Sequence, residues 1–182
     1  MTNPDTTGPI IHDAPITILK SALSAEGNPG DIKVLSDRPQ WVSLQVACQL
    51  TSAYCVAELL RELLGDLGPE TREQIALALR ELLLNAVEHG GHLDPEKTVD
   101  LSYIRTPRSV VCYIRDPGEG FSFDSLERSA ISNDAQQLFR QLELRAQQGM
   151  RPGGLGILLA KRVADDLIYS AKGNEVMFIK YL

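Results

Sequence analysis

The sequence predicts an α+β fold, and three observations lead to this prediction. Apolar and polar residues alternate over 41–48, helical periodicity extends over 51–89, and two segments with the pattern of β-hairpins cover 99–115 and 167–182. With 182 residues and 43% apolar content, the chain can bury one sizeable core, so a single domain is expected.

The first 30 residues show no stable hydrophobic period. They mix Pro, Gly, Asp and Thr around two short apolar runs, at 10–11 and 16–19. We therefore expect a flexible tail over 1–30, with room for one strand, and a folded domain over 31–182. β-favouring residues at 31–35 and 41–48 predict the first strands of that domain.

Two helices are predicted next. Thr51 or Ser52 is the expected N-cap of the first helix, which ends where a segment with Gly and Pro breaks the pattern. Pro69 fits the first turn of the second helix. The pattern continues to His89, and Gly90-Gly91 ends it.

A hairpin with strands at 99–103 and 109–115 follows the second helix. Its second strand leads into the Gly-rich loop DPGEGF, residues 116–121. The insertion that comes next, 122–152, is polar and predicts a further helix over 133–149.

The last part of the chain begins with GGLG, residues 153–156, which opens directly into a helix. That helix is expected to continue through ADDL, residues 164–167. LIYSA, a KGN turn and EVMFIKYL then predict a closing β-hairpin.

Charge and cysteine usage exclude several classes of function. The net charge of −6 provides no basic surface for nucleic acid, so a phosphate-bearing partner would be held by backbone amides or a metal, which favours a small nucleotide over DNA. The three cysteines lack C-x-x-C spacing, and His89 and His92 flank glycines where the helix ends, so neither disulfides nor zinc are expected. The absence of a long apolar run or signal-peptide pattern predicts a cytoplasmic protein without a membrane partner.

Three short stretches are candidates for chemistry. Glu81 and Asn85 lie one turn apart on the same helix face, although a solvated helix stripe would give the same pattern. Asp116 at a strand end, followed by Gly118 and Gly120, suits contact with a flat base but also suits an ordinary turn. The GGLG stretch suits phosphate binding at a helix N-terminus, although such loops often only turn the chain. Neither a P-loop nor a G-x-G-x-x-G dinucleotide motif is present.

Taken in order, these stretches resemble the Bergerat-fold ATPases, which include DNA gyrase, histidine kinases and the mismatch-repair ATPases. ELLLNA matches the N box, DPGEG the first glycine box and GGLG the second, and the insertion 122–152 matches the ATP lid. The match covers roughly residues 40 to 182. The resemblance implies a two-layer α+β sandwich with a mixed, mainly antiparallel sheet that helices cover on one face.

Within that superfamily, the short chain, the EHG after Asn85 and the closing hairpin resemble the anti-sigma-factor serine kinases of bacterial partner switching. This resemblance implies ATP and Mg²⁺ as cofactors, with Glu81 as general base, Asn85 as magnesium ligand and Asp116 as the adenine contact. It also implies a nucleotide cradle, which would consist of Gly118, Gly120, Arg151, Gly153, Gly154, Leu155 and Gly156.

The implied partner is an anti-anti-sigma (STAS) protein that would be phosphorylated on serine. A sigma factor or other regulator as a further partner, and a homodimer, are left open. An ATPase, or an ATP-dependent binding module that sequesters a partner without transferring phosphate, would retain most of the same residues. The long insertion and the N-terminal segment depart from the kinase pattern.

Overall fold

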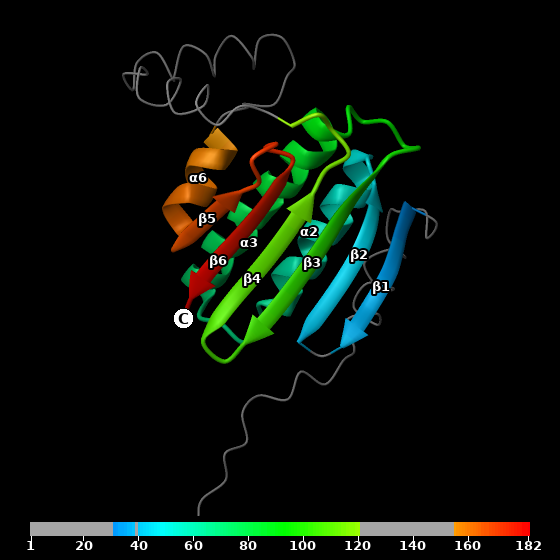
Figure 1. Ribbon diagram of the computed structural model, residues 1–182. Helices are drawn as coiled ribbons and strands as arrows, with labels where there is room; N and C mark the ends of the chain where they lie inside the picture. Colours follow the sequence, from blue (N-terminus) through cyan, green and yellow to red (C-terminus); the bar gives the residue numbers. More distant parts are fainter. Residues whose placement is uncertain (1–30, 39, 121–154) are drawn as a thin grey trace, which may run out of the picture.

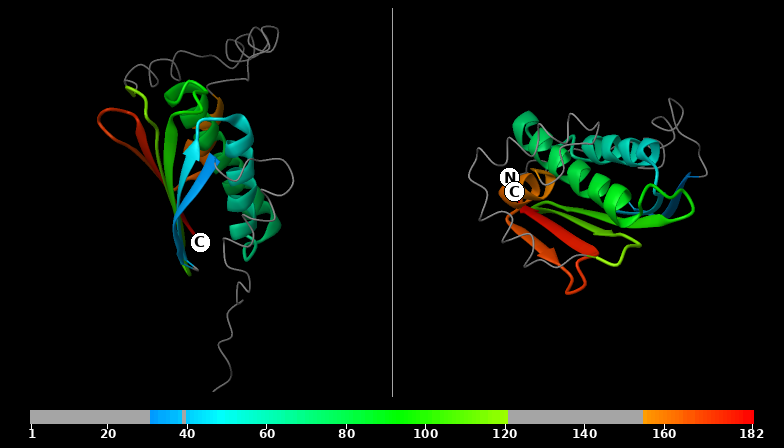
Figure 2. Two further views of the ribbon diagram at one scale, coloured as in Figure 1. Left: turned by 90° about the vertical axis from the view of Figure 1, so that its right-hand side faces the viewer. Right: turned by 90° about the horizontal axis from the view of Figure 1, so that it is seen from above.

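The structure of the protein is a computed structural model that describes residues 31–38, 40–120 and 155–182. The expected tail over 1–30, the expected lid over 122–152 and its helix over 133–149 lie outside these residues. The described part is an α+β sandwich of two layers, a sheet and a layer of helices (Figures 1 and 2).

The sheet has six strands in the order β1-β2-β3-β4-β6-β5. Each neighbouring pair is antiparallel, so the mixed sheet implied by the resemblance is antiparallel throughout the described strands. The strands are β1 (Ile32–Arg38), β2 (Trp41–Ala47), β3 (Thr98–Thr106), β4 (Ser109–Arg115), β5 (Asp166–Tyr169) and β6 (Glu175–Tyr181).

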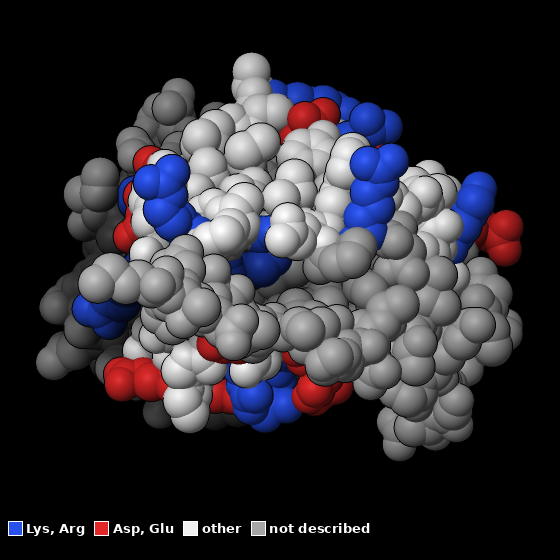
Figure 3. Space-filling view, turned by 90° about the horizontal axis from the view of Figure 1, so that it is seen from below, with Lys and Arg blue, Asp and Glu red and all other residues white. Residues whose placement is uncertain are grey.

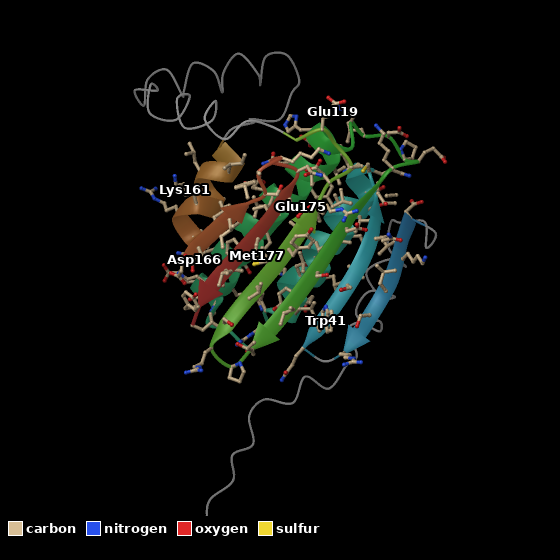
Figure 4. All side chains as sticks on the ribbon, viewed as in Figure 1. Trp41, Glu119, Lys161, Asp166, Glu175 and Met177 are labelled. Atoms are coloured by element: carbon tan, nitrogen blue, oxygen red, sulfur yellow. The ribbon has the colours of Figure 1, made fainter. Side chains whose placement is uncertain are left out.

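Three α-helices of the described ranges, α2 (Leu50–Leu63), α3 (Pro69–Asn85) and α6 (Leu155–Val163), cover one face of the sheet (Figure 2). The core lies between the two layers. In β2 the side chains of Val42, Leu44 and Val46 are at most 2% exposed, as the alternating pattern predicts. No helix of the described ranges covers the other face of the sheet, from which Trp41 and Met177 extend (Figure 4).

The predicted N-cap of the first helix is wrong. Helix α2 begins at Leu50 with Gln49 as its cap, and the Gln49 side chain makes no capping hydrogen bond within the described residues. Ser52 is buried in the first turn instead, because the helix turns this position toward the core. Helix α3 begins at Pro69 as predicted.

The last helix is shorter than predicted, because α6 ends at Val163 and β5 begins at Asp166. The amide of Asp165 donates to the carbonyl of Ile179 (2.9 Å), and its carboxylate accepts hydrogen bonds from Lys180 Nζ (3.0 Å) and the Tyr181 amide (2.6 Å). Pairing with β6 therefore ends the helix at a point that the local pattern does not mark.

Candidate nucleotide site

Helix α3 presents Glu81 and Asn85 toward the first turn of α6. A β-carbon added to Gly156 would lie 2.9 Å from Cβ of Glu81 and 3.4 Å from Nδ2 of Asn85. Only glycine allows this approach, so the first turn of α6 meets the helix face that carries the predicted base and metal ligand. The structure thus brings Glu81, Asn85 and Gly156 together.

The end of α3 changes its winding directly after Asn85. Residues Ala86–Gly90 form a π-helix, and the amide of Gly91 donates to the carbonyl of Ala86 (2.8 Å). Single π-helical turns within α-helices occur frequently at functional sites. This turn carries Gly90 to the Asp116 loop, where a β-carbon added to Gly90 would overlap the Asp116 carboxyl group. The helix therefore links the two glycine boxes.

Asp116 is half-buried and directly follows β4, which ends at the upper edge of the sheet in Figure 1. Glu119 of the same loop is exposed and is labelled in Figure 4. Its Oδ1 accepts a hydrogen bond from the amide of Gly118 (2.8 Å). Burial raises the pKa of the Asp116 carboxyl above its ordinary value of 3.8, while the Gly118 amide and Lys172 oppose the rise. A half-buried carboxylate with one oxygen already bound can present its other oxygen to a ligand.

The turn between β5 and β6 supports this loop, a role that the sequence did not suggest. Asn174, 9% exposed, pairs with Asp116 through two bonds: the Asp116 amide donates to the Asn174 carbonyl (3.0 Å), and Asn174 Nδ2 donates to the Asp116 carbonyl (3.1 Å). Lys172 Nζ donates to the Gly118 carbonyl (2.9 Å). Gly120, at φ +81°, packs so closely on the Lys172 carbonyl that a β-carbon would overlap it.

Glu81 itself has a cationic neighbour. Nη2 of Arg80 lies 3.1 Å from Oε1 of Glu81, and the Glu81 side chain is 19% exposed. Nε of Arg80 is buried and has no hydrogen-bond partner among the described residues. The ion pair lies on the same part of α3 that meets Gly156.

The remaining predicted residues are only partly described. Arg151, Gly153 and Gly154 lie outside the described residues, and Leu155 begins α6. His89 is exposed on the π-helix, and the structure assigns it no role. In the described ranges, no group of three or more His, Cys, Asp or Glu side chains could hold a metal ion. Mg²⁺ is usually bound by one or two protein oxygens together with phosphate oxygens and water, and Asn85 is the predicted protein ligand.

A hollow at the opposite end of the sheet is a competing location for a site. It contains none of the predicted site residues, and Figure 3 shows this end of the molecule, where separate basic side chains surround mostly uncharged surface. The lining residues are Arg38, Gln40, Trp41, Ile104, Arg105 and Thr106. Glu81, Asp116 and Gly156 are not among the residues that line this hollow.

Comparison with known families agrees with a nucleotide site at the Asp116 end of the sheet. The family model of the histidine kinase-like ATPase domain matches residues 46–180. This chain belongs to that family. No curated protein matches it. As a histidine kinase-like ATPase domain, it is an ATP-binding domain of the Bergerat type.

The described site residues fall into two groups along α3 and the π-helix that follows it. Asp116, Gly90 and Gly118 form one end of the site, and Asn85, Glu81 and Gly156 form the other. Glu81 and Asn85 lie on α3, whereas Gly90 ends the π-helix that follows it, so the two ends of the site are separated along the helix axis. Adenine at Asp116 would therefore leave the phosphates near Asn85 and Gly156.

Within the described ranges, no helix is long and apolar enough to span a membrane.

Proposed function

We propose that this histidine kinase-like ATPase domain is a protein-serine kinase that acts as an anti-sigma regulatory factor. Its substrate would be a serine hydroxyl of an anti-anti-sigma (STAS) partner, in a partner-switching system. ATP binding follows from membership of the family. The serine acceptor and the regulatory role are what we propose beyond it.

One observation carries the proposal for transfer rather than binding alone. A carboxylate, Glu81, lies against Gly156 at the beginning of α6, beside the predicted phosphate cradle. Holding ATP requires an adenine contact, a metal ligand and backbone amides, but it does not require a proton acceptor at the phosphate end. The Glu81 side chain is 19% exposed and is therefore not sealed in the core.

The proposed reaction is an in-line phosphoryl transfer. The serine hydroxyl gives its proton to Glu81 as its oxygen forms a bond to the γ-phosphorus, and the bond from that phosphorus to the β–γ bridging oxygen breaks. ADP leaves, and the partner keeps the phosphoryl group. When bound, Mg²⁺ would neutralise phosphate charge; Asn85 would tether it, and the amides at the start of α6 would hold the phosphates.

The test is a transfer assay with radiolabelled ATP, Mg²⁺ and a purified STAS-domain partner. Phosphoserine on the partner, absent with the Glu81→Ala variant, is the expected result. Phosphate released to water at the same rate with and without the partner would identify an ATPase. Nucleotide-dependent binding of the partner with neither product would identify a binding module. Either of these two outcomes overturns the kinase proposal.

A further inference from the structure

Glu81 is held from both sides by chemically different neighbours. Its Oε1 lies 3.1 Å from Nη2 of Arg80, whereas its Oε2 would lie 3.2 Å from a β-carbon added to Gly156. One carboxylate oxygen thus faces the guanidinium, and the other faces the first turn of α6. For a general base, the direction of the oxygen that takes the proton decides whether it can meet the acceptor hydroxyl.

Arg80 reaches Glu81 only by bending around the helix. Adjacent helical residues lie about 100° apart and do not face each other. In this position Nε of Arg80 is buried and finds no hydrogen-bond partner in the described part of the chain, although the side chain as a whole is 42% exposed. Nε of Arg105, whose guanidinium pairs with Asp66, is in the same state, so it is the contact with Glu81 beside Gly156 that distinguishes Arg80.

The same helix contains a comparison pair. Nη2 of Arg72 lies 3.3 Å from Oε1 of Glu73, again between adjacent residues. The Glu73 side chain is 53% exposed, and Nη2 of Arg61 also lies 3.0 Å from its Oε1. The two pairs share sequence order, but Arg72 also donates through Nε to Oε1 of Glu73 (3.4 Å), and of the two only the Arg80–Glu81 pair lies beside Gly156.

We propose that Arg80 is a positioning residue for the general base. Its guanidinium fixes Oε1 of Glu81, which aims Oε2 at the phosphate end of the site. This inference rests on the proposed function, because it assigns Arg80 a role in the proton transfer that phosphoryl transfer requires.

The experiment is a double-mutant cycle on the full chain, with phosphoryl transfer and ATP KM as readouts. Arg80→Ala should lower kcat by about 10- to 100-fold, the effect of misplacing a reacting group by about 1 Å, with ATP KM changed less than about twofold. In a Glu81→Gln background, Arg80→Ala should lower kcat by less than about twofold, because no carboxylate remains to be aimed. Arg80→Lys should restore most of the rate, since it returns a cation to Oε1.

The control variant is Arg72→Ala, which removes the comparison pair and should leave kcat at the parent value. Equal losses from Arg80→Ala in the parent and in the Glu81→Gln background would show a structural role and overturn the inference, as would a parent-like kcat for Arg80→Ala. If Arg80→Ala does not fold, Arg80→Lys and Arg80→Gln decide: the lysine variant must retain activity that the glutamine variant loses. A parent protein with no phosphoryl transfer overturns the proposed function itself, so the two failures are distinguishable.

Discussion

Asp116 is the residue whose protonation should control ATP binding. The proposed adenine contact needs the ionised carboxylate, and burial raises the pKa of this group above 3.8. Acidification should therefore weaken ATP binding at a higher pH than an ordinary aspartate would, with binding complete above the raised pKa and lost as the pH falls through it. Calorimetric titration of ATP across a pH series measures this.

The Asp116→Asn variant is the matched control for that pH series. It should bind ATP more weakly at neutral pH by about 1.5–3 kcal/mol, the contribution of a hydrogen bond to a charged group, and should lose the pH dependence. A raised pKa means that the ionised carboxylate destabilises the fold at neutral pH, and that protonation removes this destabilisation. In the absence of ATP, the uncharged variant should therefore unfold at a temperature no lower than that of the parent. Unchanged ATP affinity in Asp116→Asn would contradict the adenine contact.

Glu81 and Asn85 lie on one helix face but should fail in different ways. Asn85→Ala should lose Mg²⁺-dependent ATP binding, because it removes the only predicted protein ligand of the metal. Glu81→Ala should still bind ATP and partner but lose phosphoryl transfer by roughly 10²- to 10⁴-fold, the usual contribution of a general base. Parent-like binding and turnover in both variants would mean that this face is merely solvated.

At the scale of elements, the π-helix after α3 is the link between the two ends of the site. Gly90→Ala would place a methyl group where the Asp116 carboxyl group lies, so that carboxyl group must move. We expect weaker ATP binding and a loss of stability of about 1–3 kcal/mol, the usual cost of overpacking. Gly68→Ala is the control, since a β-carbon there would meet nothing within 4 Å among the described residues. An equal ATP affinity in the two variants would contradict the link.

The elements that the sequence predicted well are those with a long local pattern. The alternation in β2 and the periodicity of α3 from Pro69 are both borne out, because burial on one face repeats along the segment. The N-cap of α2 was wrong, since tertiary packing buries Ser52. The end of α6 was misplaced because Asp165 pairs with β6, whose residues are distant in sequence.

The site residues also divide into those with a local sequence motif and those without one. Glu81, Asn85, Asp116 and Gly156 could be proposed because each belongs to a motif with its own spacing, and the structure places them in two linked groups. Asn174 and Lys172 could not be predicted from the sequence, because their turn meets the Asp116 loop only after β6 pairs with β4. The KGN turn itself gives no signal beyond a hairpin.

For the whole molecule, the site collects groups from elements that are far apart in the chain. It joins α3, the loop after β4, the start of α6 and, through Asn174, the turn before β6. These elements span both layers of the sandwich (Figure 1). A ligand that binds only when all of them are folded must stabilise the entire described domain rather than one helix.

ATP with Mg²⁺ should therefore raise the unfolding temperature of the whole domain. At a ligand concentration about 100 times Kd, linkage gives about 2.7 kcal/mol. For a chain of this size, 1 kcal/mol corresponds to roughly 2–4 °C, so the expected rise is about 5–10 °C in a single cooperative transition. Thermal melts followed by circular dichroism measure it. GTP should give no comparable rise, because guanine has a carbonyl at the position where adenine has the amine that would donate to Asp116. Asn85→Ala should not respond to ATP with Mg²⁺. A rise of the same size with GTP would show that the phosphates alone hold the nucleotide and that Asp116 does not read the base.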